Sequence, residues 1–449
     1  MQAPRSVPGR HRAATQAPPP ARGAARRAGT HARRARAEGG FLRVFGLAEF
    51  RALWAAQLLS VAGDQMARVA LTVLVYQRTG SALLAAAAYA ATIAPVFIGG
   101  VLLSGVADRW PRRAVMIACD LARVPVIALM AVPGVPTAAL IGLLCVATAI
   151  GAPFGSARAA IYPDVLGQDY PLGTAVTMTT YQAGQVLGFA AGGTVVSLVG
   201  AQAALLADAG TFLASALTVA LWVRGRPVGA AREDGSARSS VMSAVRLTLG
   251  DRSARTPMLL GWVSWAYNVP EALAVPLART AGGGAGAASA VMGAAAVGSA
   301  AGAITLTRLA GPSARQRLSI PLAFTACAVL TAVALRPGLP GILAILLVSG
   351  LCDSYQVQAN ASFVAAVPDS LRGQAFGLAL GGMYLGQGAV MTVAGAAAEH
   401  AGALPVIAVA GAAGAAAAVL ISVSSRTGLR PTCVPHRGPP VSLLVRWAA

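Results

Sequence analysis

The sequence contains no lysine: the 35 basic residues are all arginine, against 15 acidic residues. A nucleotide-binding loop of the type G-x-x-x-x-G-K-[ST] needs a lysine to contact the phosphates. ATP-driven work by this chain alone is therefore not expected. The sequence also has no catalytic triad and no cluster of metal ligands, so we expect neither an enzyme nor a bound metal or cofactor.

Cysteine and histidine are scarce as well. The five cysteines have no paired spacing, and four of them lie inside apolar runs. Such cysteines act as small hydrophobic side chains rather than as a disulfide framework or a zinc site. The four histidines are scattered and form no cluster.

Charged residues of either sign make up only 11% of the chain, and the mean hydropathy is +0.66. A soluble protein of 449 residues needs far more charged surface than this. The apolar residues fall into blocks of about 20, the length that crosses a hydrocarbon core of about 30 Å. The sequence therefore predicts an all-α polytopic membrane protein.

The apolar blocks predict twelve transmembrane helices. Their expected ranges are 48–76, 82–106, 114–133, 137–160, 173–199, 202–224, 257–279, 288–310, 318–336, 340–366, 374–398 and 403–424. Together with the polar segments they predict a disordered basic tail (1–43), a six-helix half (44–224), a linker (225–256), a second six-helix half (257–424) and a final tail (425–449). The linker is polar and basic, with an interfacial helix expected at about Val241 to Leu249.

The arginines are distributed asymmetrically between alternate loops. With the amino terminus inside, the outer loops hold only Arg78, Arg279 and Arg336. This is the positive-inside pattern, so both termini are expected in the cytoplasm and the protein in the cell membrane. The net charge of +20 then reflects topology and attraction to anionic lipid, and nucleic acid is not an expected partner.

Short motifs repeat between the two halves. IYPDVLGQDY follows the fourth predicted span and AVPDSLRGQA follows the tenth, with Pro163-Asp164 and Pro368-Asp369 separated by 205 residues. The same separation relates Arg112 to Arg317. Parallel repeats of this kind form a substrate site at their interface, near the bilayer midplane.

The loop between the second and third spans carries the most specific motif. It reads Gly105-Val-Ala-Asp108-Arg109-Trp-Pro-Arg112-Arg113. This stretch resembles the inner-loop signature of the major facilitator superfamily, and the resemblance extends through span count, repeat and linker over about residues 44–424. The stretch FRALWAAQLLSVAGDQMARVALTVLVYQRTGS resembles the first span of the drug-efflux branch that includes macrolide and siderophore exporters.

The resemblance implies that this loop is a conformational latch. A carboxylate at Asp108 suits the positive end of a neighbouring helix, and the arginines can pair with acids on adjacent cytoplasmic ends. In the family the equivalent Asp docks on the start of span eleven. Asp120, Arg123 and Arg158 are expected near the inner face, as an extension of the latch network. The alternative is that these arginines only fix the topology.

A glycine motif in the fifth span supports the efflux reading. Gly184, Gly188, Gly192 and Gly193 resemble the antiporter pattern G-x-x-x-G-P-x-x-G-G, with Phe189 in the proline position. Small residues let helices approach closely in lipid. A tight contact with span eight is expected, and glycine packing without functional meaning is the alternative.

Ionisable residues inside predicted spans are candidate functional sites, because each costs about 2.5–3.5 kcal/mol to insert. Asp64 and Arg68 lie one turn apart in span one, so they either neutralise one another or are separated by a cavity. Glu271 has no basic residue within a helical turn and lies beside Asn268 and two prolines. An unpaired carboxyl there is disfavoured in its charged form, so it can bind a proton or a cation.

The tenth span carries a polar stripe of Asp353, Gln356 and Asn360, at spacings of three and four residues. This stripe either lines a cavity or makes a polar contact between helices. The whole pattern predicts a monomeric alternating-access exporter that exchanges a small hydrophobic molecule for protons. The alternatives are an uncoupled facilitator or importer of the same fold, and a membrane sensor or scaffold that transports nothing.

Overall fold

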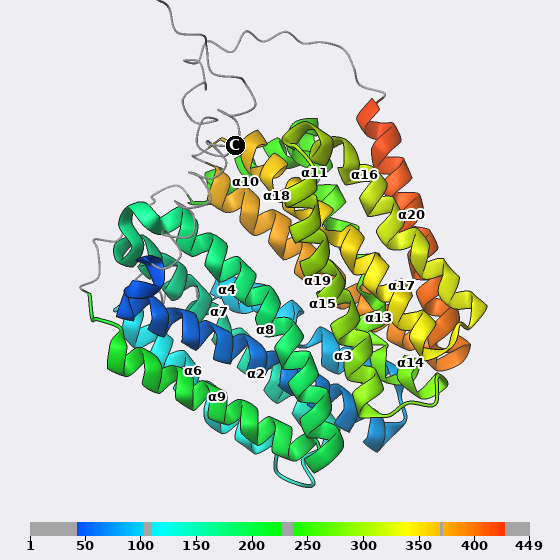
Figure 1. The fold of residues 1–449 in the computed structure, drawn as a ribbon, viewed down its shortest axis with the longest axis horizontal. Coiled ribbons are helices and arrows are strands. Elements are labelled where there is room, and N and C mark those ends of the chain that lie inside the picture. Colours follow the sequence, from blue (N-terminus) through cyan, green and yellow to red (C-terminus); the bar gives the residue numbers. More distant parts are fainter. Residues whose placement is uncertain (1–42, 103–109, 227–236, 369–370, 427–449) are drawn as a thin grey trace, which may run out of the picture.

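The computed structural model describes residues 43–102, 110–226, 237–368 and 371–426 (Figure 1). These residues form helices and turns, and they contain no strand. The two terminal segments predicted to be tails lie almost entirely outside the described residues.

The first half of the bundle consists of the helices before the linker. Its second span is divided in two by a turn at residues 91–93. The helices are α2 (Ala48–Thr79), α3 (Ala82–Ala90), α4 (Ala94–Leu102), α6 (Arg112–Met130), α7 (Thr137–Leu166), the short η1 (Gly167–Asp169), α8 (Tyr170–Val199) and α9 (Ala201–Trp222).

The linker contains one helix, α10 (Ala237–Gly250), which covers the segment predicted to be helical. The second half follows it, and its first span is divided into four pieces. The helices are α11 (Arg252–Trp262), α12 (Ser264–Tyr267), α13 (Val269–Ala272), α14 (Ala274–Thr280), α15 (Ala285–Leu309), α16 (Pro312–Ala328), η2 (Val329–Leu335), α17 (Gly338–Asp353), α18 (Tyr355–Ala366), α19 (Arg372–Ala401) and α20 (Ala403–Arg426).

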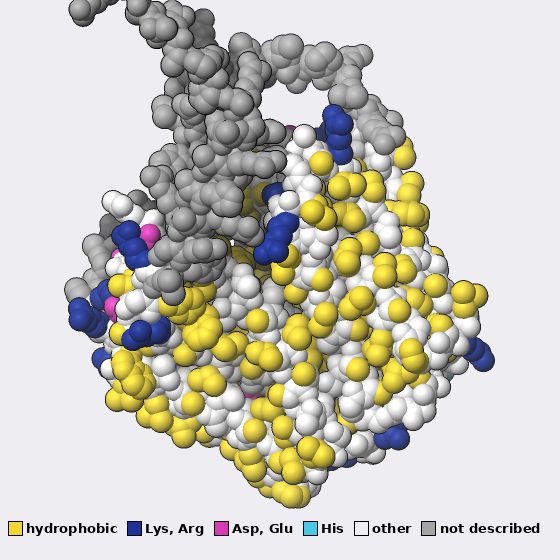
Figure 2. All heavy atoms as spheres, viewed as in Figure 1, with side chains coloured by type: hydrophobic (Ala, Val, Ile, Leu, Met, Phe, Trp, Pro, Cys, Tyr) yellow, Lys and Arg dark blue, Asp and Glu magenta, His cyan; other side chains and the backbone are white. Residues whose placement is uncertain are grey.

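Ten helical segments of the described chain are long and apolar enough to cross a membrane. The two remaining predicted spans are also present. One is α6, whose four charged residues reduce its hydropathy, and the other is the divided helix α11–α14. Hydrophobic side chains are spread over the visible face, and arginines lie mainly toward its margins (Figure 2). The prediction of an all-α polytopic membrane fold with two six-helix halves is confirmed.

An even number of crossings places the start of α2 and the end of α20 at the same end of the bundle (Figure 1). We call this the terminal end, and the other the distal end. Side-chain hydrogen bonds between the halves extend from the distal end, at Ser81 and Glu399, to about mid-depth, at Gln182 and Ser299. Among the described residues, none joins the halves nearer the terminal end.

Two of the three interruptions in α11–α14, at Asn268 and Leu273, lie just before prolines. Pro270 and Pro276 cannot donate to the helical ladder. Backbone groups at membrane depth must still be satisfied within the protein. Tyr355 Oη donates to the Leu260 carbonyl at 2.9 Å, and Gln356 Nε2 donates to the Gly261 carbonyl at 3.1 Å. Side chains of span ten therefore compensate for part of the interruption in span seven.

The same divided span is fixed to α19 by two tryptophans. The Trp262 and Trp265 rings stack with centroids 5.1 Å apart. Their indole nitrogens donate to the carbonyls of Ala379 and Met383, each at 2.9 Å. Glycines of α19 face the rings, and a Cβ at Gly382 would lie 2.3 Å from the Trp262 ring.

The glycine motif of α8 has a different main partner from the one predicted. Added Cβ atoms at Gly184, Gly188 and Gly192 would meet α2, and only one at Gly193 would meet α15, at 2.3 Å from the Ser289 Cβ. The α8–α15 contact is present, because Ser289 Oγ donates to the Phe189 carbonyl. The motif therefore packs mainly spans five and one together. In span eight, added Cβ atoms at Gly298 and Gly302 would meet α17, and one at Gly293 would lie 3.7 Å from the Phe189 Cβ of α8.

Gly188 is the position where this packing is tightest against backbone. Its Cβ would lie 2.5 Å from the Ala62 carbonyl oxygen. We expect Gly188→Val to lower the stability of the folded protein by about 1–3 kcal/mol, the usual cost of overpacking. Gly210→Val is the matched control, because no atom lies within 4 Å of a Cβ there. Thermal unfolding of the two purified variants in detergent tests this, and equal melting temperatures would contradict it.

Candidate functional site

The middle of the bundle holds a contact between the halves that is built from ionisable side chains. The Tyr89 hydroxyl, on α3, donates a hydrogen bond to the Glu271 carboxylate, on α13. The Arg68 guanidinium, on α2, lies over the Tyr89 ring with its central carbon 5.1 Å from the ring centroid. Arg68 also interacts electrostatically with Glu271. Two helices of the first half therefore meet the second half at one carboxylate.

These side chains are partly accessible. Arg68 and Glu271 are partly exposed, and Tyr181 of α8, which interacts electrostatically with both, is 46% exposed. The side chains face one another between the halves rather than the outer surface of the bundle. The exposed parts of these side chains therefore lie beside the contact between the halves. As predicted, no basic residue lies within a turn of Glu271 in its own helix. Arg68 approaches Glu271 from the other half.

Asp353 is held by neighbouring helices of the second half. Tyr267 Oη donates to one of its carboxylate oxygens, and Ser299 Oγ donates to the other at 3.0 Å. Gln356 Nε2 donates to Tyr267 Oη at 2.9 Å. Asp353 and Gln356 thus make polar contacts between helices, and both are also partly exposed.

The two amides of the predicted site lie apart from this network. Asn360 is exposed on α18, and Asn268 is the partly exposed residue between α12 and α13. Neither side chain makes a hydrogen bond within the described residues. They therefore remain candidates by position only.

Of the two alternatives for Asp64 and Arg68, the ion pair between them is not present. Asp64 forms an ion pair with Arg123 of α6, whose side chain is 7% exposed. Arg123 also lies over the Phe212 ring of α9, with its guanidinium carbon 3.7 Å from the centroid. Arg68 is instead directed toward Tyr89. Arg123 reaches Asp64 from a helix that is distant in sequence. The spacing of residues along one helix cannot predict such a partner.

Arg123 also corrects the predicted latch network. It lies eleven residues into α6, about 16 Å from the start of that helix at 1.5 Å per residue. It therefore belongs to the interior of the membrane-spanning region rather than to the inner face. Asp120, one turn earlier on the same helix, is fully buried. Arg158 is partly exposed, and its guanidinium lies 5.8 Å from the Phe154 ring centroid.

The other loop arginines make contacts within the first half. Arg112 Nη1 donates to the Ala160 carbonyl at 2.7 Å and to Asp164 Oδ2 at 3.2 Å, both on α7. Arg113 donates to the Ala220 carbonyl near the end of α9. These two residues join helices of one half, while Gly105, Asp108 and Arg109 lie outside the described residues.

Two features of the bundle ends were not predicted. At the terminal end, Arg226 binds both carboxylate oxygens of Glu49, at 2.6 and 2.9 Å. At the distal end, the Glu399 carboxylate accepts hydrogen bonds from Ser81 Oγ and from the Leu83 amide at 2.9 Å, so α19 caps the start of α3. Glu49 and Glu399 each lie at the end of an apolar run. An acid in such a place is usually a solvent-exposed surface residue, so the sequence did not indicate these contacts.

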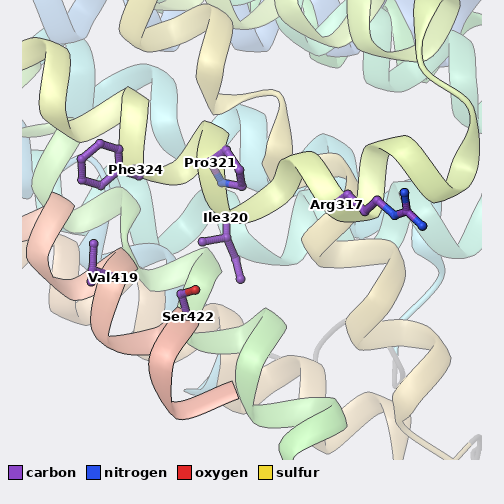
Figure 3. Close-up of a pocket in the computed structure, with 6 residues that line it drawn as sticks. All are labelled: Arg317, Ile320, Pro321, Phe324, Val419 and Ser422. Atoms are coloured by element: carbon purple, nitrogen blue, oxygen red, sulfur yellow. The ribbon is translucent and has the colours of Figure 1, made fainter. Parts of the chain in front are cut away.

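Two pockets on the bundle are apolar and separate from the central side chains. One, of about 380 Å³, lies between α16 and α20 (Figure 3) and is lined by Arg317, Ile320, Pro321, Phe324, Val419 and Ser422. The other, of about 710 Å³, lies between α8, α15 and α17. Its serine and threonine hydroxyls at 194, 197 and 289 donate to backbone carbonyls, so the pocket presents a mainly apolar wall.

The comparison with protein families decides the class of this protein. The family model described as Major Facilitator Superfamily matches residues 53–354, which is more than half of the chain. The chain belongs to the Major Facilitator Superfamily. It is therefore a membrane transporter of that type and not an enzyme.

Solved structures share the major facilitator fold with this chain. A POT family transporter in complex with a thioalcohol conjugated peptide has a TM-score of 0.68 at 10% identity, over 84% of this chain and 96% of its own. The nucleoside transporter NupG has a TM-score of 0.62 at 16% identity, over 84% and 99%. A bacterial homolog of the human lysosomal transporter Spinster, in an inward-facing and unoccupied conformation, has 0.61 at 15%, over 84% and 97%. At these identities the likeness shows the fold alone. No curated protein matches the sequence.

The ion pair of Arg123 should matter for folding of this major facilitator protein. Removing Arg123 leaves the Asp64 carboxylate, whose side chain is 40% exposed, without its partner, so the cost is smaller than the about 3–5 kcal/mol of a fully buried pair. We expect Arg123→Gln to lower the melting temperature of the purified protein, and Asp64→Asn in the same chain to restore part of the loss. Arg308→Gln, at an exposed position of α15, is the control. A variant Arg123→Gln as stable as that control would contradict the structural role.

Proposed function

We propose that this protein is a secondary active exporter of a small hydrophobic or amphipathic molecule, energised by proton antiport. Glu271 is the coupling residue, and a water-accessible space beside it, with Arg68 and Tyr181, is the substrate cavity. The resemblance of span one and of the glycine motif to drug-efflux relatives supports the direction of transport. The solved structures of similar fold belong to peptide and nucleoside transporters, so they support transport of a small molecule without identifying it.

The observation that supports coupling most is the hydrogen bond from Tyr89 to Glu271 across the two halves. An ionised Glu271 accepts this bond and attracts Arg68, and both interactions favour the arrangement in which the halves are joined here. A protonated Glu271 no longer attracts Arg68. Protonation of one side chain therefore changes the free energy of a contact between the parts that move in alternating access.

An uncoupled facilitator or an importer of the same fold is the competing proposal. It needs no acid that changes protonation during the cycle, so Glu271 would act only as a hydrogen-bond acceptor. Glutamine keeps that acceptor and the shape of the side chain. The two proposals therefore differ in what Glu271→Gln does to energised transport.

We expect Glu271→Gln to abolish the acceleration of export by an imposed pH gradient in reconstituted vesicles. Binding of a neutral substrate should largely persist, because the substitution leaves the cavity shape unchanged. The substrate is first found by screening for compounds whose cellular accumulation falls on expression of the wild type. Glu399→Gln is the matched control, because it makes the same change at another contact between the halves, at the distal end. A response of Glu271→Gln to the gradient equal to that of wild type would refute coupling through this residue.

The orientation is part of the proposal. The terminal end of the bundle, with both termini, the linker and most arginines, faces the cytoplasm of a cell membrane, where the arginines attract anionic lipid. We expect reporter domains fused to either terminus to be active only in the cytoplasm. An external reporter at either terminus would invert the assignment of every loop.

A further inference from the structure

A second group of ionisable side chains lies inside the first half, away from Glu271. Asp64 on α2, Asp120 and Arg123 on α6, and Asp208 on α9 interact electrostatically with one another. We call these four residues the aspartate cluster. Helix α9 packs against both α2 and α6, so the cluster is enclosed by three helices of one half.

The surrounding helices leave room for the cluster at two glycines. A Cβ at Gly63 would lie 2.3 Å from Asp208 Oδ1, so that carboxylate approaches the backbone of α2. A Cβ at Gly151, on α7, would lie 3.3 Å from the guanidinium carbon of Arg123. A larger residue at either position would displace a charged group.

Two of the three carboxyl groups are buried and incompletely bonded. Asp120 and Asp208 are both 0% exposed. Within the described part of the chain, neither oxygen of Asp120 has a hydrogen-bond partner, and Oδ2 of Asp208 has none either. Asp208 Oδ1 accepts a 3.3 Å bond from Thr211 Oγ1. The fully buried Ser215 Oγ lies beside Asp120 but makes no bond of good geometry. An ionised carboxylate without partners is very costly in such a place.

The charges of the neighbouring helices do not balance three carboxylates. Arg123 is the cluster's only ion-pair partner within 4 Å among the described residues. Arg158 of α7 interacts with Asp120 at longer range. Tyr181 of α8 and Arg68 of α2 interact with Asp64, but Arg68 is also committed to Tyr89 and Glu271. Even when Arg158 is counted, carboxyl groups exceed guanidinium groups by one.

The cluster does not have the arrangement of a metal site. Among the described residues, no three side chains of the metal-binding types are arranged to hold one. The smallest species that neutralises a buried carboxylate is a proton. The ligand that fits this group is therefore H⁺, bound as a carboxylic acid.

We propose that Asp120 and Asp208 hold a proton inside the first half and exchange it with the central space through Asp64. The Asp64 side chain is 40% exposed, whereas the other two carboxyl groups do not reach water. A hydronium ion in the central space donates a proton to Asp64: its O–H bond breaks and leaves water, while an O–H bond forms on Asp64 and weakens the pairing with Arg123. That O–H bond then breaks as one forms on the buried pair, and Asp64 is again a carboxylate paired with Arg123. Release follows the same steps in reverse.

The proton on Asp120 and Asp208 can be present whether or not the protein is a proton-coupled exporter. A role of this proton in transport rests on the proposed function. The proton is measured without a substrate, by the infrared C=O stretching band of protonated carboxyl groups. The samples are the full-length protein in phosphatidylcholine and phosphatidylglycerol vesicles at neutral pH. All variants are compared in a Glu271→Gln background, which removes the acid of the proposed coupling site.

We expect Asp120→Asn with Asp208→Asn to remove a band of about one carboxyl group. Asp164→Asn, at an exposed ion pair with Arg112, should leave the spectrum unchanged. Asparagine resembles a protonated aspartate in shape, and if the double variant does not insert, each single variant is measured instead. A band unaffected by substitution of either residue overturns the proposal.

The path of the proton through Asp64 is tested separately, by following the exchange of the bound proton for deuterium in D₂O. We expect Asp64→Asn to slow the isotope shift of the band several-fold: the accessible member of the cluster is lost, while Asp120 and Asp208 stay buried and incompletely bonded and so keep the proton. An exchange rate equal to that of the parent would overturn the relay through Asp64. Failure of proton coupling at Glu271 would appear only in transport, with this band still present.

Discussion

A charge placed in the hydrocarbon core of a bilayer needs a partner within the protein, and this constraint explains much of the structure. An uncompensated charged side chain costs several kilocalories per mole at membrane depth. Asp64 is therefore found with Arg123, and Glu271 with Tyr89 and Arg68. In each case the partner lies on another helix, so the requirement for compensation also determines which helices must be neighbours.

Compensation at short range in turn requires close helix packing. An aspartate side chain is short, so Asp208 reaches α2 only because Gly63 presents no side chain there. The glycines of α8 serve the same end by bringing that helix onto α2. Where a helix is interrupted, as in α11–α14, buried Tyr355 and the partly exposed Gln356 supply the missing hydrogen bonds. Small residues therefore allow the close helix packing that the polar groups need to reach their partners.

The sequence was sufficient for the fold because hydrophobic length and loop charge act locally. Each of the twelve predicted spans corresponds to a helix or a divided helix, and proline located the interruption near Glu271. The partners of the charged residues could be predicted less well from the sequence. Helical spacing indicated Arg68 as the neighbour of Asp64, but the rotation of α6 that brings Arg123 there depends on packing with α7 and α9. For the same reason the glycine motif was assigned mainly to span eight rather than to α2.

The two central contacts differ in what a rigid rotation of the halves does to them. Asp64 and Arg123 belong to the same half, so a rigid rotation of the halves leaves their pair intact. Tyr89 and Glu271 belong to different halves, so separation of the halves at this depth must break their hydrogen bond. Arg68 lies between the two contacts and interacts with Asp64 as well as Glu271. The first contact therefore stabilises a half of the transporter, and only the second can report the relative position of the halves.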